Sequence, residues 1–224
     1  MQLIIFIGTI LLGGLLSLGL KPKAKVFNLL ATGYIILAII LSICTWIFYF
    51  AGIKRGLILE ALSFIMSSGG MLGHFVLGYL AGCIAADNKP TKAMISSTLW
   101  GISILTANAF LVATAGKSQH IDEMITFFKA SGYAIWFLFF IMTAEALGAL
   151  GILLHFKLRS GPLAAAGLAI IMLGAVYTHW HNKDPFSDSY AAVGQLINLS
   201  LILILYYFEQ QVNRRHPASS IYVI

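Results

Sequence analysis

Charged side chains are scarce in this 224-residue sequence: Asp, Glu, Lys and Arg make up 10% of it, and hydrophobic residues make up 59%. A soluble domain carries about 25% charged residues, because water must wet its surface. The sequence therefore lacks the charge that a water-exposed globule of this size needs. We predict that lipid surrounds most of the chain, as in an integral membrane protein.

The sequence also has only two cysteines and none of the common catalytic motifs. Cys44 and Cys83 lie in separate apolar runs and form no Cys-x-x-Cys, which argues against a disulfide framework or a redox dithiol. The sequence has no Walker loop, nucleophile elbow, His-Glu-x-x-His or dinucleotide glycine fingerprint. Its formal net charge is +6, but the cations occur in short groups between apolar runs, which argues against a nucleic-acid partner.

Long apolar runs account for most of the chain. A helix needs roughly 20 apolar residues to cross a hydrocarbon core of about 30 Å. Runs of this kind occupy Leu3–Leu20, Val26–Ala51, Ala61–Ala86, Ala93–Ala115, Gly132–Phe156, Gly161–Trp180 and Tyr190–Phe208. The first run is followed rather than preceded by lysines, unlike a cleaved signal peptide. These runs predict an all-α membrane bundle of about seven transmembrane helices.

The cations predict the orientation of the bundle. With the amino terminus outside, the inner side receives Lys21, Lys23, Lys25, Lys89, Lys92, Lys157, Arg159, Arg214 and Arg215. The outer side receives Lys54, Arg55, Lys117, Lys129 and Lys183. This 9 to 5 distribution favours an outside amino terminus and a cytoplasmic carboxyl terminus in the inner (plasma) membrane.

Two further patterns concern helix packing. Residues 117–131 contain Ile121, Met124, Ile125, Phe127 and Phe128 among polar residues, which predicts a short amphipathic helix at the membrane interface. Small residues four apart let another backbone approach closely, and they occur at Gly69–Gly73 and Gly78–Gly82.

Ionisable groups at membrane depth are the first candidates for function, because each costs several kcal/mol unless it has a partner. Glu145 is the only charged residue between Tyr133 and Phe156, about halfway along its run. His74 lies near mid-depth in the glycine-rich third run, and a hydrogen bond between the two is one geometry that the sequence allows. A purely structural role for both residues is the alternative.

Cofactor and metal sites are less favoured. His74 among glycines suggests a b-type haem, but the sequence places no second histidine at mid-depth, so haem is disfavoured. His179, His181 and Asp184 carry acceptable zinc ligands near the outer surface. Residues two apart do not share a helix face, however, so we favour a hydrated rim over a metal site. Such a rim can hold the polar head of a small amphipathic ligand.

Residues of about 92–208 resemble the DoxX family of small four-helix membrane proteins. The resemblance rests on short motifs in each of the four runs, namely Phe110 with Ala115-Gly116-Lys117, Phe127-Phe128 with Gly132, Glu145-x-x-Gly148 before the basic turn Lys157–Arg159, and Ile171–Ala175 with Thr178-His179. It divides the chain into a three-helix extension (1–88), which the family unit lacks, a DoxX-like four-helix bundle (89–210) and a short cytoplasmic tail (211–224).

The resemblance implies a membrane redox process linked to quinones, such as thiosulfate:quinone oxidoreduction, or a role in oxidative-stress complexes. It singles out Lys117, Glu145 and His179. We therefore expect a membrane subunit that binds a quinone or a small amphipathic ligand, with Glu145, His74, Lys117 and His179 as ligand-binding or proton-relay candidates. The alternative is a non-catalytic assembly subunit or chaperone of a larger complex with membrane or periplasmic partners. A transporter ranks last, because the sequence shows no internal repeat.

Overall fold

The computed structural model describes residues 8, 11–12, 14–15, 24–51, 78 and 92–215 of the chain. These residues are almost entirely helical and include no strand. The predicted spans Leu3–Leu20 and Ala61–Ala86 lie mostly outside the described residues, as does His74. Within the described part, four helices are long and apolar enough to cross a membrane, over Ile95–Gln119, Ile135–Leu153, Gly161–His181 and Asp188–Val212.

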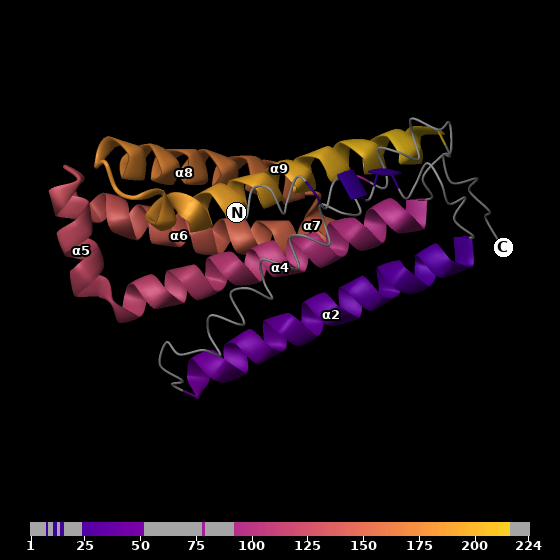
Figure 1. The fold of residues 1–224 in the computed structure, drawn as a ribbon, viewed down its shortest axis with the longest axis horizontal. Coiled ribbons are helices and arrows are strands. Elements are labelled where there is room, and N and C mark those ends of the chain that lie inside the picture. Colours follow the sequence, from indigo (N-terminus) through magenta and orange to yellow (C-terminus); the bar gives the residue numbers. More distant parts are fainter. Residues whose placement is uncertain are drawn as a thin grey trace.

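These four spans form a closed bundle. They belong to α4 (Lys92–Gln119), α6 (Ile135–Leu153), α8 (Gly161–His181) and α9 (Phe186–Arg215). Each packs against the next, and α9 returns to pack against α4 (Figure 1). α9 continues past residue 210, where the tail was predicted to begin. Short connections hold neighbouring helices antiparallel, as in other small bundles.

The bundle is apolar both inside and outside. Its core includes fully buried Leu99, Ile102, Leu168 and Leu199 from three of the four helices. Large apolar side chains are also exposed on the outer surface, including Trp136, Phe140, Leu147, Ile170 and Trp180. An apolar surface of this extent is suited to lipid, so the chain is a multi-pass membrane protein.

Two glycines allow α6 and α8 to approach closely. A Cβ added to Gly148 would lie 2.6 Å from Cγ of Leu168, and one added to Gly151 would lie 2.8 Å from Cβ of Ala164. Close backbone approach at small residues is the usual way in which membrane helices associate. It fixes the depth of α6 relative to α8, and therefore the depth of Glu145.

The amphipathic helix predicted over 117–131 is confirmed as α5 (Ile121–Ala130), which crosses the end of the bundle where α4 stops and α6 begins (Figure 1). The predicted apolar positions are half-buried, whereas Asp122, Glu123 and Lys129 are exposed. We call this end of the bundle the α5 end. The opposite end, where the short helix α7 (His155–Leu158) joins α6 to α8, is the α7 end.

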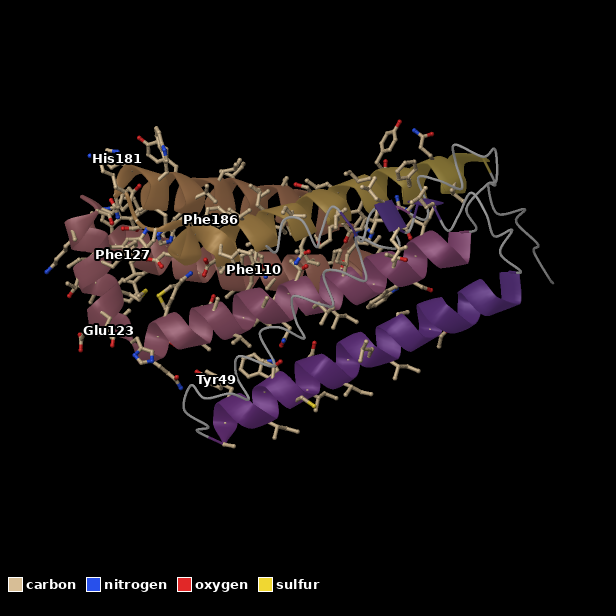
Figure 2. The ribbon with its side chains drawn as sticks, in the orientation of Figure 1. Tyr49, Phe110, Glu123, Phe127, His181 and Phe186 are labelled. Atoms are coloured by element: carbon tan, nitrogen blue, oxygen red, sulfur yellow. The ribbon has the colours of Figure 1, made fainter. Side chains whose placement is uncertain are left out.

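An additional helix lies outside the ring. α2 (Ala24–Phe50) begins two residues before the predicted run Val26–Ala51 and ends one residue before its end. It packs against α4 alone among the described helices (Figure 1). Tyr49, near its last residue, lies toward the α5 end, so α2 runs parallel to α4 (Figure 2). Elsewhere in the amino-terminal part, the buried Gly78 has its carbonyl oxygen 3.5 Å from the position of a Cβ on Gly14, which agrees with close packing at a small residue.

Candidate functional site: a buried ion pair between α4 and α6

Glu145 faces the interior of the bundle from the middle of α6. Its side chain is 2% exposed, and it is the only charged residue in this helix. It belongs to the buried stripe of α6 together with Leu138, Met142, Ala149 and Ile152. The spacing of three and four residues places this stripe on one helix face, so the fold directs the carboxylate into an apolar interior.

Lys117 of α4 supplies the charge that balances Glu145. Its ammonium nitrogen Nζ lies 2.6 Å from Oε1 and 2.5 Å from Oε2 of Glu145, so it donates to both carboxylate oxygens. The Thr114 hydroxyl donates to Oε2 over 3.3 Å. Thr114 and Lys117 are three residues apart and therefore share one face of α4. Together, the three side chains form a charged and hydrogen-bonded site between two spans.

The side chains of Lys117 and Glu145 differ in how far they are exposed. The Lys117 side chain is 25% exposed, whereas that of Glu145 is 2% exposed. The lysine stem extends from the last turns of α4 toward the carboxylate. A ligand that enters from the α5 end therefore meets the ammonium group before it meets the carboxylate. Removing one partner of such a pair leaves an uncompensated buried charge, which costs about 3–5 kcal/mol.

His179 has a partner of its own. Its Nδ1 lies 2.8 Å from Oδ2 of Asp184, and the Asp184 backbone N–H donates to the His179 carbonyl oxygen over 3.0 Å. The Phe127 ring of α5 lies against the imidazole, with centroids 5.7 Å apart. The pair therefore organises the loop after α8, beneath α5, and is separate from the hydrogen bonds of Glu145.

Further polar contacts join α8 to the turn between α5 and α6. The hydroxyl oxygens of Tyr133 and Thr178 are 2.9 Å apart, and the Asn182 amide donates to the Ser131 hydroxyl over 2.8 Å. Thr178 belongs to the motif that carries the family resemblance, but the sequence did not predict these contacts. They hold α5 over the end of the bundle, so the rim is ordered by direct side-chain contacts.

The weaker metal candidates do not converge. His179 and Asp184 are paired, but His181 is exposed and stacks on Tyr177, with ring centroids 5.9 Å apart. Figure 2 shows His181 at the upper edge of the α5 end. Among the residues that the structure describes, no three His, Cys, Asp or Glu side chains are grouped as metal ligands.

A second polar cluster lies at the α7 end. Nε2 of His155 is 3.8 Å from Oε2 of Glu209, and the Ser96 hydroxyl donates to Oε1 of Glu209 over 3.0 Å. The Gly161 backbone N–H donates to Nδ1 of His155 over 3.3 Å, which leaves Nε2 as the protonated nitrogen of the neutral ring. Burial lowers the pKa of His155 below its usual 6.5, although Glu209 opposes this shift. The sequence carries no signal that His155 and Glu209 are neighbours.

Comparison with known proteins agrees with this architecture. Residues 101–204, from the third turn of α4 to the second half of α9, match the model of the DoxX-like family. This part of the chain is similar to members of that family. The DoxX-like region contains the Lys117–Glu145 pair and His179, and it confirms the resemblance drawn from the sequence motifs. No curated protein and no solved structure matches the chain.

Proposed function

We propose that the DoxX-like region is a membrane subunit that binds a quinone, or a small amphipathic ligand like it, beside the Lys117–Glu145 pair. The observation that carries the proposal is this ion pair within a bundle of apolar spans. Ionisable side chains at membrane depth are rare and mark ligand, ion or proton sites by default. The family resemblance to quinone-linked proteins supplies the ligand class.

The residues present fit such a ligand. A quinone has carbonyl oxygens that accept hydrogen bonds and an apolar ring and tail. An ammonium group has three N–H donors, and the contacts of Lys117 with the two Glu145 oxygens account for two of them. Leu138 and Met142 share the buried stripe of α6 with Glu145 and supply apolar surface. Lys117 would hold the polar head, and the bundle would hold the ring.

The chain's own residues would serve proton transfer. A quinone supplies two-electron redox chemistry when bound, and a partner subunit would supply the electrons. Glu145 can hold a proton, and the neighbouring Thr114 hydroxyl and Lys117 ammonium can donate hydrogen bonds to whichever oxygen carries negative charge. His179 and Asp184 would order the rim around the entrance, without contact with the reacting group.

The membrane arrangement is part of the same proposal. We place the protein in the inner membrane, with seven spans, an outside amino terminus and a cytoplasmic carboxyl terminus. The α5 end then faces outward, and α5 lies in the outer interface. The electron-donating partner would be a membrane or periplasmic subunit.

Ligand retention tests the proposal. The full chain is purified from its native membrane in mild detergent, and extracted quinone is quantified per mole of protein. We expect wild type and Glu123→Gln to retain quinone and Glu145→Gln to lose most of it. Glu123 is an exposed carboxylate paired with His120, so Glu123→Gln makes the same change outside the site and is the matched control. Absence of quinone from wild type, or equal retention by the two variants, would contradict the proposal and favour a non-catalytic assembly subunit.

A further inference from the structure

Polar side chains follow one face of α4 along its whole membrane span. Ser96, Ser103, Thr106, Thr114 and Lys117 fall within about 80° of one another at 100° per residue. Ser96 donates to Glu209 of α9, and Thr114 and Lys117 donate to Glu145 of α6. These contacts show that the shared face points into the bundle.

α9 presents a matching face. Glu209, Tyr206 and Gln195 fall within about 60° of one another on this helix. The Ser96–Glu209 hydrogen bond joins the beginning of α4 to the end of α9, so the two helices are antiparallel and their polar faces meet. Tyr206 lies close to Ser103, and its ring contacts that of His155 at a tilt, with centroids 4.1 Å apart and an interplanar angle of 52°.

The middle of this row consists of buried polar atoms. Oγ1 of Thr106 and Oε1 of Gln195 have no hydrogen-bond partner among the described residues, and the Ser103 and Tyr206 hydroxyls are buried close to each other. Ser103 is 0% exposed and Thr106 is 1% exposed. An unsatisfied buried group costs about 1–3 kcal/mol, and native proteins commonly satisfy such groups with internal water.

The row ends at two ionisable pairs on opposite sides of the bundle. His155 and Glu209 lie at the α7 end, and Lys117 and Glu145 lie toward the α5 end. From Ser96 to Lys117 the helix rises about 31 Å at 1.5 Å per residue. A bilayer hydrocarbon core is about 30 Å thick. The positions of the row on α4 therefore extend over about the thickness of the apolar layer, and the Lys117 side chain turns back from the α5 end to the Glu145 carboxylate midway along α6.

We propose that the interior of the bundle conducts protons across the membrane along this row, with water bridging the unpartnered hydroxyl and amide groups. A hydroxyl group or a water accepts one proton and releases another, so a proton entering at His155–Glu209 leads to release of one at Lys117–Glu145, or the reverse. Protons move down their electrochemical gradient, and no covalent bond of the chain is altered. Proton conduction along this path does not require a quinone bound at the Lys117–Glu145 pair.

Phe110 interrupts the polar row. It is 2% exposed and lies on the same face of α4, between Thr106 and Thr114. Gln195 of α9 provides the unpartnered polar atom nearest to this level in the antiparallel register. A bulky aromatic ring in a polar row limits the number of waters that can line up. It therefore sets a slow rate of conduction.

Proton flux into liposomes tests this inference. The full chain is reconstituted into potassium-loaded phosphatidylcholine vesicles that contain a pH-sensitive dye, and valinomycin is added to draw protons inward. We expect acidification faster than in protein-free vesicles, loss of most of this flux in Ser103→Ala/Thr106→Val, and an increase in Phe110→Ala. Thr143→Val is the matched control, because Thr143 is an exposed residue of α6 whose hydroxyl donates to the Phe139 carbonyl of its own helix.

Two outcomes would overturn the inference: wild-type flux equal to that of protein-free vesicles, or undiminished flux in the double variant. Quinone content measured on the same samples separates this test from that of the proposed function. If the double variant retains quinone but loses proton flux, the variant is folded and lacks only the proton path. A conducting wild type without quinone supports the path and contradicts the ligand proposal.

Discussion

Lys117 donates to both oxygens of Glu145, so that a lysine near the end of one span neutralises a carboxylate buried in the middle of another. The chain segment that connects α4 to α6 would not by itself fix the depth of one helix in the membrane relative to the other. The ion pair fixes it, because displacement of either helix would separate the charges in an apolar medium, where the attraction between them is strong.

The pair should show strong coupling in a double-mutant cycle. Lys117→Met alone and Glu145→Leu alone each leave one uncompensated charge, and each should destabilise the protein by about 3–5 kcal/mol. The double variant Lys117→Met/Glu145→Leu has no charge to bury and should recover most of this loss. Reversible denaturation in detergent or bicelles measures the three free energies. Additive losses in the double variant would show that the two side chains do not interact.

Stability should fall in mild acid because of His155. Burial lowers the pKa of this imidazole below 6.5, so between its folded pKa and 6.5 the unfolded chain binds more protons than the folded chain. The stabilising contribution is complete above pH 6.5 and is lost as the pH falls through the folded pKa. Melting temperatures between pH 8 and pH 5 should drop more steeply for wild type than for His155→Asn. His181→Asn, which changes an exposed imidazole, should retain the wild-type slope.

The α6–α8 contact should tolerate no side chain at Gly148. A Cβ there would lie within 3.0 Å of three Leu168 side-chain atoms, so Gly148→Ala should force the helices apart and destabilise the protein. Overpacking of this kind costs about 1–3 kcal/mol. Gly167→Ala in α8 is the control, because nothing lies within 4 Å of its Cβ position. That variant should be neutral or stabilised by up to about 1 kcal/mol. Equal melting temperatures for the two variants would refute the close contact.

Trp136 and Trp180 should report the depth of the α5 end. Their side chains are 69% and 75% exposed, and they lie near the first residue of α6 and the last residue of α8. Tryptophan favours the membrane interface. In a variant with Trp46→Phe and Trp100→Phe, headgroup-attached nitroxides should quench the remaining fluorescence more strongly than nitroxides at the ends of the acyl chains. The reverse order would place the α5 end within the hydrocarbon layer.

Sequence patterns predicted the helices that the structure describes, but not all of their ends. The run Ala93–Ala115 was predicted to stop at Gly116-Lys117, whereas α4 continues to Gln119. Helical continuation satisfies backbone groups that lipid cannot satisfy, and a lysine can remain helical while its long side chain reaches a partner. At the other end, the run predicted to reach Phe156 ends at Leu153 in α6, and α7 forms a separate turn.

The candidate site was only partly predictable from the sequence. Burial of Glu145 follows from its isolation in an apolar run, and the structure confirms it. Its partners do not follow, because contacts between helices depend on their depth and rotation. The hydrogen bond with His74, which the sequence allows, concerns a residue outside the described part. Thr114 carried no sequence signal beyond its spacing from Lys117. Glu209 was missed because it lies near the end of a long span, where an acidic residue is unremarkable.

Ligand binding to a purified variant that lacks both charges of the Lys117–Glu145 pair tests the central claim most directly. The full chain in nanodiscs is titrated with a short-chain ubiquinone analogue, and binding is followed by calorimetry. We predict saturable binding to wild type and to Glu123→Gln, and none to the double variant Lys117→Met/Glu145→Leu, whose helical circular-dichroism spectrum should be unchanged. Equal affinity in all three proteins, or no saturable binding to wild type, would contradict a quinone site at the Lys117–Glu145 pair.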